Sequence, residues 1–409
     1  MNLQSLLDDS RGIHDDLRGI RRTIHRHPEI GLDLPRTQAI VLRALDGLAM
    51  DTTLGERSTS VTGVLRGGAG PDAARPVVLL RADMDALPVQ ELADVEYRSQ
   101  VEHVMHACGH DLHTAMLVGA ARLLEARSAD LPGDVVLMFQ PGEEGWAGAK
   151  VMIEEGVLDA AGRRADAAYG MHVFSAMAPH GTFVTKAGPM LAAADDFTVT
   201  VRGTGGHGSA PHAALDPVPA AAEMVSALQV AATRTFDAHD PVVVTVGVLR
   251  AGTRRNVIPD EAHIEATVRS FSTANRDRAE DVFPRVARGV AAAHGLDVEV
   301  VYTRDYPVTV NDESETAFAG TVIENLFGER RHLRWPRPLS ASEDFSFVLE
   351  QVPGTFVGLA APVEGADLRT AEFNHSPRAV FDDGVLADGA AVYAALAIAR
   401  LEQLAHQGS

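Results

Sequence analysis

Residues 77–88 have the sequence VVLLRADMDALP, in which an aliphatic run leads directly into two carboxylates. The segment Val77–Arg81 is typical of a β-strand. Asp83 and Asp85 stand two residues apart, just past the carboxyl end of that strand. Open α/β sheets place their ligand sites at the carboxyl ends of strands. The stretch therefore predicts a sheet with a polar site at one edge, although an ordinary acidic loop has the same pattern.

The alternation of strand, polar loop and helix continues on both sides of this stretch. Strands are predicted at 61–66, 134–139 and 165–171, and helices at 3–27, 34–48, 112–127 and 148–158. Glu143 and Glu144 follow the strand 134–139, and His172 follows the strand 165–171. Strands that alternate with helices in this way predict an α/β domain with a largely parallel sheet.

The pattern changes between residues 190 and 304. There the predicted elements are strand 197–202, helix 213–236, strands 242–249 and 262–270, helix 276–294 and strand 298–303. This βαββαβ order is the ferredoxin-like split motif. The α/β pattern then resumes with helix 315–327, short helix 345–350, strand 355–359 and helix 384–404. We therefore expect a catalytic domain of residues 1–189 and 305–409, with a satellite domain of residues 190–304 inserted in it.

Composition narrows the class of protein. A chain of 409 residues favours two domains. The formal net charge of -20 argues against nucleic acid or an anionic membrane as a partner, because both need a basic face. Met1–Ser10 lacks the apolar run of a signal peptide, and no stretch approaches the ~20 apolar residues of a membrane span. A single cysteine excludes an internal disulfide and fits a reducing compartment, so the sequence predicts a cytoplasmic protein.

That cysteine lies in residues 106–113, which have the sequence HACGHDLH. Cys108 and His110 stand two apart, so in an extended segment their side chains point the same way. A thiolate and an imidazole on one side of the chain form half of a transition-metal site. Two other interpretations remain open: a lone cysteine is often a small buried hydrophobe, and a cysteine near histidines can be a nucleophile.

Several further side chains could complete a metal site. The potential ligands that fall at or near predicted strand ends are Cys108, His110, Glu143, Glu144, His172 and His375. One ion needs about four ligands, so this set is too rich for a single ion and suits two.

The ordered motifs resemble those of a known family. The matching runs are RADMDALP at 81–88, HACGHDLH at 106–113, QPGEEG at 140–145, GMH at 170–172, GGHGSAPH at 205–212, NVIP at 256–259, SEDF at 342–345, and His375. They cover nearly the whole chain. It resembles the dinuclear metallo-aminoacylase and carboxypeptidase family, and most of all the amidohydrolase branch with hippurate hydrolases, N-acyl-L-amino acid amidohydrolases and auxin-conjugate hydrolases.

The resemblance implies a fold and a metal site. The fold would be a phosphorylase/hydrolase-like αβα catalytic domain with a mixed, largely parallel sheet, plus an inserted α+β ferredoxin-like satellite domain. Two divalent metal ions, Zn or Mn with Co or Ni as alternatives, would be held by Cys108, His110, Glu144, His172 and His375. Related branches have His in place of Asp83 and a bridging Asp in place of Cys108. That difference suggests that Asp83 and Asp85 orient the ligands rather than bind the ions.

The resemblance also implies a mechanism. A hydroxide that bridges the two ions would attack the acyl carbonyl, with Glu143 as the general base that then protonates the departing amine. His207 would stabilise the oxyanion. Arg269 and Asn256 would bind the carboxylate of the amino acid. In several relatives such residues come from a partner subunit, which makes a homodimer through the satellite domain possible.

The predicted function is therefore a metal-dependent amidohydrolase that cleaves small N-acyl amino acids into a carboxylic acid and a free amino acid. A dipeptidase or carboxypeptidase on the same scaffold is the first alternative. A metal-binding or peptide-binding protein without catalysis is the second, and it would be favoured if a ligand or the base were missing. The acyl group and the amino acid are not readable from these motifs.

Overall fold

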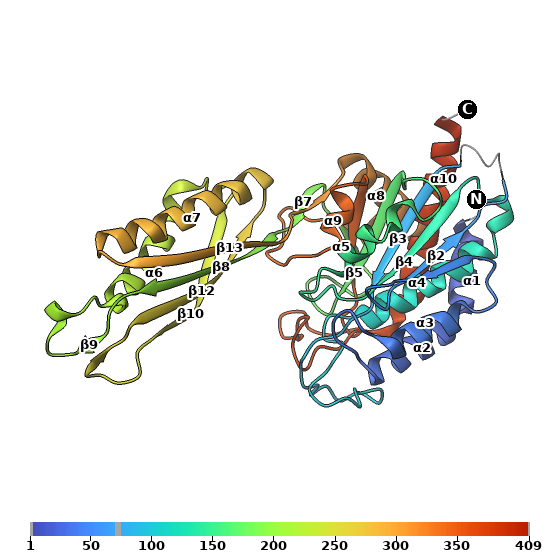
Figure 1. Cartoon of the computed structure of the whole chain (residues 1–409). Coiled ribbons are helices and arrows are strands. Elements are labelled where there is room, and N and C mark those ends of the chain that lie inside the picture. Colours follow the sequence, from blue (N-terminus) through green and yellow to red (C-terminus); the bar gives the residue numbers. More distant parts are fainter. Residues whose placement is uncertain (1–2, 70–74, 408–409) are drawn as a thin grey trace. The chain divides into compact units, whose positions relative to one another are not determined.

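The computed structural model describes residues 3–69 and 75–407, which form two compact units (Figure 1). Unit 1 comprises Met1–Gly188, Val310–Arg337 and Phe347–Ser409, and unit 2 comprises Pro189–Thr309 and Pro338–Ser346. The chain passes between the units in strands β7 (Gly188–Leu191) and β14 (Thr309–Asn311), which pair with each other.

The predicted domain bounds lie near these divisions, but the segment 338–346 groups with unit 2. The ends of the predicted catalytic domain, at residues 1 and 409, lie outside the described residues. The assignment of one domain as catalytic and the other as a satellite stays a prediction.

Unit 1 contains an eight-stranded mixed sheet. Its order is β1-β2-β4-β3-β5-β16-β6-β15, formed by β1 (Asp51–Leu54), β2 (Val61–Leu65), β3 (Val77–Asp83), β4 (Asp134–Gln140), β5 (Ala167–Phe174), β6 (Phe183–Thr185), β15 (His332–Arg334) and β16 (Gly354–Ala360). The central strands β4, β3, β5 and β16 run parallel to one another. Strands β1, β2 and β6 supply the antiparallel pairs. The prediction of a largely parallel α/β sheet is confirmed.

The core of unit 1 lies between this sheet and helices α4 (His110–Glu125) and α10 (Leu386–Gln407). Because side chains of alternate residues point to opposite faces of a strand, the residues between those of this core face the other side of the sheet. On that side, Leu79, Val136 and Met138 are also fully buried, and α5 (Gly148–Glu154) packs against β4. Helix α10 is long and apolar enough to span a membrane, but 78% of its most apolar window is buried within the protein, as in a core helix.

The remaining helices of unit 1 are α1 (Leu3–Gly12), α2 (His14–Arg26), α3 (Pro35–Leu45), α8 (Glu313–Phe327) and α9 (Ser346–Leu349), of which α9 begins on the last residue of unit 2. The prediction of one helix over residues 3–27 is wrong. The helix breaks at Ile13, whose backbone is not helical, directly after Gly12. Glycine is a poor helix former and favours a stop at this point.

Unit 2 is a four-stranded antiparallel sheet with two helices packed on it (Figure 1). Its elements are β8 (Ala193–Arg202), α6 (Pro217–Thr235), β10 (Val242–Ala251), β12 (Glu261–Ser270), α7 (Thr273–Ala293) and β13 (Asp297–Tyr306), with sheet order β10-β12-β8-β13. Asp216 caps α6 and Ser272 caps α7. The predicted βαββαβ motif is confirmed. A short ribbon of β9 (Gly206–His207) and β11 (Val257–Ile258) extends from it.

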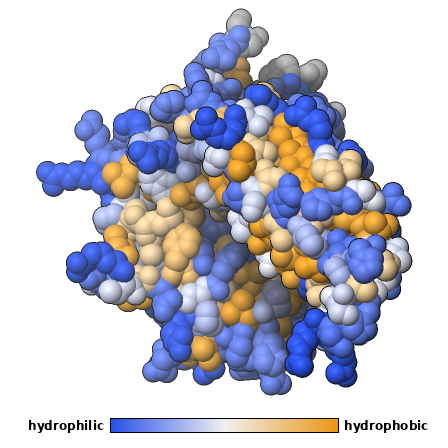
Figure 2. All heavy atoms as spheres, turned by 90° about the vertical axis from the view of Figure 1, so that its left-hand side faces the viewer, coloured by the Kyte–Doolittle hydropathy of each residue, from blue (hydrophilic) through white to orange (hydrophobic). Residues whose placement is uncertain are grey.

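Hydrophobic side chains remain exposed on unit 2. Val218 and Val230 on α6 are 40% and 60% exposed, and Leu249 on strand β10 is 49% exposed. Figure 2 shows hydrophobic patches among polar ones on the face that it displays. Strand β10 is also an edge strand of its sheet. Exposed edge strands and apolar patches are typical of surfaces that pair with another chain.

Candidate metal centre

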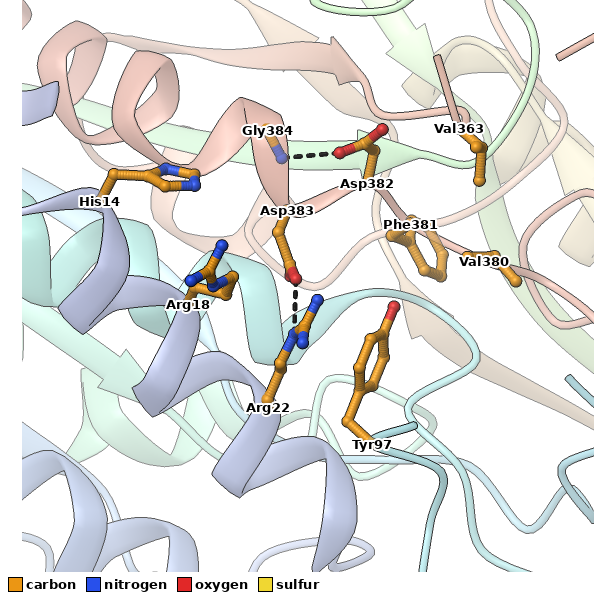
Figure 3. Close-up of a pocket in the computed structure, with 10 residues that line it drawn as sticks. All are labelled: His14, Arg18, Arg22, Tyr97, Val363, Val380, Phe381, Asp382, Asp383 and Gly384. Carbon is orange, nitrogen blue, oxygen red and sulfur yellow. Dashed lines mark hydrogen bonds and ion pairs between the residues drawn. The ribbon is translucent and has the colours of Figure 1, made fainter. Parts of the chain in front are cut away.

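Unit 1 contains two polar regions that could be functional sites. The first is a cavity of about 360 Å³ between helix α2 and residues 380–384 (Figure 3). Two of its charged groups pair with each other, since Arg22 Nε donates to Asp383 Oδ2 at 2.8 Å. None of the predicted metal ligands lines this cavity. The second region is the cluster around Cys108, where the predicted ligands meet.

The turn from Cys108 into helix α4 depends on Gly109. Its φ is +92°, and a Cβ at this position would lie 2.4 Å from Val173 Cγ2. Only glycine tolerates both the left-handed backbone and the close approach of strand β5. The turn places Cys108 at the amino end of α4 and His110 in its first turn. Two residues that are near in sequence therefore form a compact pair of candidate ligands.

Asp85 joins the glutamate loop to His110. The backbone N–H groups of Glu143 and Glu144 donate to Asp85 Oδ1 and Oδ2, both at 3.0 Å. Asp85 Oδ1 also lies 3.3 Å from His110 Nδ1. One carboxylate thus contacts two segments that carry candidate ligands, and its orienting role stays a prediction.

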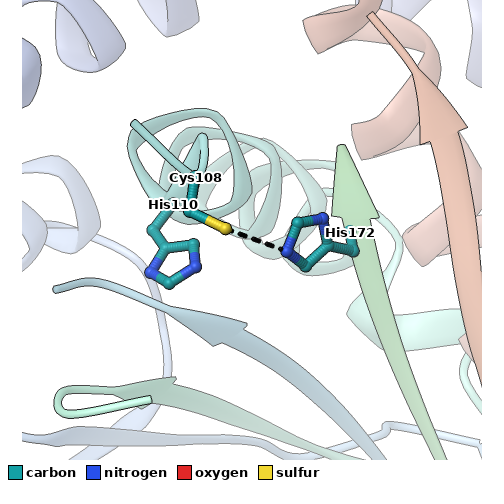
Figure 4. Close-up of side chains that lie close together, drawn as sticks. All are labelled: Cys108, His110 and His172. Carbon is teal, nitrogen blue, oxygen red and sulfur yellow. Dashed lines mark hydrogen bonds between the residues drawn. The ribbon is translucent and has the colours of Figure 1, made fainter. Parts of the chain in front are cut away.

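The structure places His172 inside β5 rather than after it, because the strand extends to Phe174. His172 Nδ1 lies 2.8 Å from the carbonyl oxygen of Val173. That hydrogen bond makes Nδ1 the donor and leaves a lone pair on Nε2, which is the candidate ligand atom. His172 Nε2 lies 3.3 Å from Cys108 Sγ, and His110 lies on the other side of the sulfur (Figure 4).

His375, in the loop between β16 and α10, contacts the same sulfur atom of Cys108. Its backbone N–H donates to the carbonyl of Ala107 at 2.8 Å, and its φ is +70°. A non-glycine residue in this region is strained, and such strain is common at functional sites. His375 Nε2 lies 3.2 Å from Cys108 Sγ and 3.2 Å from Glu144 Oε1.

These contacts form two groups of three donors that share one atom. Cys108, His110 and His172 make one group, and Cys108, Glu144 and His375 make the other, with the donor atoms of each within 4.8 Å of one another. Glu143 lies with His110 and Glu144 in a further group. Two groups that overlap at a single sulfur atom fit two ions that share a bridging ligand.

The electrostatics of the cluster also fit cations. Hydrogen bonds with Cys108 and with Glu144 raise the pKa of His375 to about 10. Burial lowers the pKa of His110, but the charges of Asp83 and Cys108 outweigh it and hold that pKa well above its usual value. Neither ring nitrogen of His110 makes a hydrogen bond of good geometry. Donors that attract positive charge, with mixed S, N and O atoms, match the preferences of Zn²⁺ and similar ions. Cys108 and His110 are buried, whereas the side chain of His375 is 54% exposed.

Asp83 braces the cluster from behind. Its Oδ2 accepts from Arg81 Nη1 at 2.7 Å, and its Oδ1 lies 2.5 Å from His113 Nδ1. Burial raises the pKa of Asp83, but the Arg81 guanidinium and the adjacent histidines outweigh it and hold that pKa well below the usual range. His113 Nε2 accepts from the N–H of Val173 at 2.8 Å. Both nitrogens of His113 are therefore engaged, which leaves it as a support rather than a ligand.

A second buried polar cluster lies beside the first, and sequence reasoning missed it. We call it the Arg21 network: Arg21, His25, Glu91, Asp111 and Asp383. Arg21 Nε lies 2.7 Å from Asp111 Oδ2, and Arg21 Nη1 lies 3.0 Å from Asp383 Oδ1. His25 Nδ1 and Nε2 lie 2.8 Å from Asp111 and 3.2 Å from Glu91. The only sequence signal was a histidine and an arginine on one face of a helix.

The remaining predicted site residues belong to unit 2. His207 is exposed on β9, where its Nδ1 accepts from the N–H of Ser209 at 3.2 Å. Asn256 lies beside it, since its carbonyl accepts from Gly208 N–H at 2.9 Å. Arg269 lies near the far end of strand β12, where its guanidinium donates to Thr267 Oγ1 and to the carbonyl of Val268. The strand from Glu261 to Arg269 spans eight residue steps, or ~26 Å at the usual rise.

Comparison with known proteins agrees with this architecture. The family described as Peptidase family M20/M25/M40 matches residues 79–399. The chain is 37% identical over 402 residues to thermostable carboxypeptidase 2 of Saccharolobus solfataricus, covering 97% of this chain and 98% of the relative. It is 36% identical to hippurate hydrolase of Campylobacter jejuni, covering 97% and 100% of the two chains.

A solved structure shows the same fold. It is a Bacillus subtilis dinuclear metal-binding peptidase of the M20 family, with a TM-score of 0.81, 32% identity, and coverage of 96% of this chain and 99% of that chain. Fold and donor set define a metallopeptidase-like α/β protein with an inserted ferredoxin-like unit. The chain belongs to peptidase family M20/M25/M40. The predicted resemblance is confirmed, whereas the individual ligand and substrate assignments stay predictions.

Proposed function

We propose that this protein is a metal-dependent amidohydrolase that cleaves N-acyl amino acids into a carboxylic acid and a free amino acid. The observation that carries the proposal is Glu143, a buried carboxylate beside a donor cluster that is otherwise complete. The relatedness to a hippurate hydrolase supports the reaction class, because hippurate is an N-acyl amino acid.

Two divalent ions would be held by Cys108, His110, Glu144, His172 and His375, with Cys108 shared. When bound, such ions lower the pKa of a shared water towards neutrality and polarise the acyl carbonyl. Glu143 takes a proton from the water and delivers it to the departing amine, so one carboxylate serves as base and then as acid. Asp83 and Asp85 keep the ligands in place through the contacts described above.

His207 is suited to the oxyanion. Because its Nδ1 accepts a hydrogen bond from Ser209 N–H, its proton lies on Nε2, which is a ready donor. Arg269 offers a planar fork for the substrate carboxylate, and Asn256 offers an amide beside His207.

We further propose that the protein works as a homodimer through unit 2. His207 and Asn256 lie at one end of the unit 2 sheet, and Arg269 lies ~26 Å along strand β12 from the start of that strand at Glu261. A small N-acyl amino acid cannot span that distance, so the two ends would serve one substrate only if they came from different copies. Exposed strand β10 and the apolar residues of α6 support such pairing.

The native ions are proposed to be Zn or Mn, with Co or Ni as alternatives, since mixed S, N and O ligands accept all four. A cytoplasmic location is proposed because a thiolate ligand survives best in a reducing compartment. The acidic surface implied by a net charge of -20 favours small substrates over nucleic acid or anionic membranes.

The test is a panel of N-acetyl, N-benzoyl and N-indolylacetyl amino acids, assayed with each metal after treatment with a chelator. We expect hydrolysis of at least one class, lost on chelation and restored by a divalent ion. Hydrolysis that survives complete metal removal would point instead to Cys108 as a nucleophile. Bound metal without hydrolysis across the panel would revive a binding role.

A carboxypeptidase or dipeptidase is the second candidate, favoured by the 37% identity to a thermostable carboxypeptidase. The discriminating comparison uses three substrates with the same C-terminal amino acid: an N-acyl amino acid, a dipeptide with a free amino terminus, and a dipeptide whose amino terminus is blocked. A preference for the dipeptide with the free amino terminus would identify a dipeptidase, and equal use of the blocked dipeptide would identify a carboxypeptidase. A preference for the simple acyl group supports the main proposal.

A further inference from the structure

Asn374 precedes His375 and touches three of the segments that carry candidate ligands. Its Nδ2 donates to the carbonyl oxygen of Cys108 at 3.1 Å and to that of Val173 at 3.0 Å. Its Oδ1 accepts from the backbone N–H of Ser175 at 3.0 Å. The Ser175 hydroxyl lies 3.1 Å from the same oxygen and 2.9 Å from the carbonyl of Glu372, so its single hydrogen serves one of these two acceptors. Both N–H groups of the Asn374 amide and at least one lone pair of its oxygen are therefore used.

The surroundings fix the orientation of the amide. Its nitrogen faces two carbonyl oxygens, which can only accept, and its oxygen faces a backbone N–H, which can only donate. Turning the amide over would place oxygen against oxygen and nitrogen against N–H. No other arrangement of Asn374 satisfies these partners.

Each contact of Asn374 reaches a different candidate ligand. The carbonyl of Val173 that it binds is also the acceptor for His172 Nδ1, so it helps to keep His172 Nε2 directed at the sulfur. The Cys108 contact holds the backbone of the shared ligand, and Nδ2 lies 3.9 Å from Cys108 Sγ itself. Asn374 is joined to the third candidate ligand, His375, by a peptide bond. Its hydrogen bonds therefore also restrain the left-handed backbone of His375.

We propose that Asn374 is a positioning residue that sets the geometry in which Cys108, His172 and His375 meet their ions. It binds no ion itself; it links the strand β5 end, the turn before α4 and the His375 segment through one side chain. Loss of this link lets the three donors separate, so that both ions bind more weakly and the thiolate environment changes. The proposal rests on the proposed metal site but not on the identity of the substrate.

The test measures metal binding directly. In Asn374→Ala we expect the dissociation constants of both ions, determined by competition with a coloured chelator, to rise by about 10–100-fold, as is common when a residue that orients ligands is removed. In Co²⁺-loaded protein we expect the thiolate-to-cobalt charge-transfer band to shift or weaken. At saturating metal, kcat should fall while KM changes little, because substrate contacts are intact.

The matched control is Ser376→Ala. Ser376 lies in the same segment, but its hydroxyl donates to the exposed carboxylate of Glu372 at 2.7 Å and contacts no candidate ligand. It should leave the metal dissociation constants and the cobalt band unchanged. If Asn374→Ala does not fold, as judged by circular dichroism, Asn374→Ser replaces it, since a hydroxyl cannot reach both carbonyls.

A merely structural role gives a different pattern. In that case the folded variant would melt at a lower temperature, yet its metal dissociation constants would stay within about two-fold of wild type. Such a result, with an unchanged cobalt band, overturns the proposal. Failure of the proposed function would show separately, as metal-loaded wild type that hydrolyses nothing on the substrate panel.

Discussion

His110 and Asp111 are neighbours in the first turn of helix α4, yet they belong to two different buried clusters. His110 faces the donors around Cys108, and Asp111 faces the Arg21 network. In the Arg21 network each carboxylate meets a guanidinium or an imidazole within 3.2 Å. Around Cys108, the sulfur, the Glu144 carboxylate and the imidazoles of His110, His172 and His375 converge as potential metal donors, and the Arg81 guanidinium pairs with the supporting Asp83 behind them. Burial and polarity alone therefore do not mark a metal site; the convergence of several donor atoms does.

The pKa shifts follow the same division. Burial raises the pKa of Asp111, but the Arg21 guanidinium and His25 outweigh it and hold that pKa far below the usual range. That carboxylate is already neutralised by the protein. Among the candidate metal ligands, by contrast, His110 and His375 have raised pKa values, because the negative charges and hydrogen-bond acceptors beside them outweigh burial. Burial and the adjacent His113 hold the pKa of His172 well below its usual value, which favours the neutral imidazole that binds a metal ion. The first cluster stabilises the fold, and the second is arranged to accept ions.

The largest expected effect is a loss of catalytic activity when a residue of the Cys108 cluster is replaced, but not when a residue of the Arg21 network is replaced. Glu143→Gln should lower kcat by about 10²–10⁴-fold, because the general base is lost, while metal content and melting temperature stay near wild type. Glu91→Gln is the matched control, since Glu91 is equally buried but belongs to the Arg21 network. It should lower stability and leave kcat nearly unchanged. Steady-state kinetics and thermal unfolding decide, and the opposite pattern would reverse the assignment of the clusters.

The next effect concerns stability. Arg21→Met should destabilise the protein by about 3–5 kcal/mol, because it leaves Asp111 and Asp383 as buried carboxylates without their main partner. Arg22→Met is the control: Arg22 also contacts Asp383, but its side chain is 31% exposed, so we expect a loss of about 0–1 kcal/mol. Chemical unfolding of the metal-loaded protein measures both. Equal losses of stability in the two variants would show that burial does not determine how much these ion pairs contribute to the free energy of unfolding.

A smaller effect depends on pH. Burial lowers the pKa of His25, but Asp111 and a hydrogen bond to Glu91 outweigh it and raise that pKa above its usual value. A raised pKa in the folded state stabilises the protein below the unfolded value of about 6.5, and this contribution disappears as pH rises through the folded pKa. The stability difference between wild type and His25→Gln should therefore be largest below pH ~6.5 and shrink as the pH rises above that value. A difference that grows with pH would contradict the assignment.

Much of this could be predicted from the sequence. Long apolar runs such as Val77–Arg81 and ordered motifs around Cys108 carry enough local information to define the sheet, the inserted unit and the candidate ligands. The edge strand β1 and the inner strand β6 were missed, because β1 is exposed along its length and β6 has three residues. Their pairing depends on neighbours distant in sequence rather than on local pattern.

The supporting residues were harder to foresee for a different reason. Asn374, Arg21 and Glu91 act through hydrogen bonds to segments 60 or more positions away. No spacing rule reports such contacts, and asparagine beside a histidine is common in loops. The two ring nitrogens of His25 pair within the Arg21 network, with Asp111 and Glu91, which no local pattern around His25 indicates. Chemistry-bearing residues are visible in a sequence, whereas their supports are visible only in the fold.

The central claim is that two divalent ions share Cys108. Its most direct test is the metal content per chain, measured by elemental analysis after equilibration with excess Zn²⁺ or Mn²⁺ and removal of free ion, in wild type and in Cys108→Ala. We predict two ions per chain in wild type and loss of tight binding of both ions in the variant. One ion or none in wild type, or two tightly bound ions in Cys108→Ala, would contradict the account.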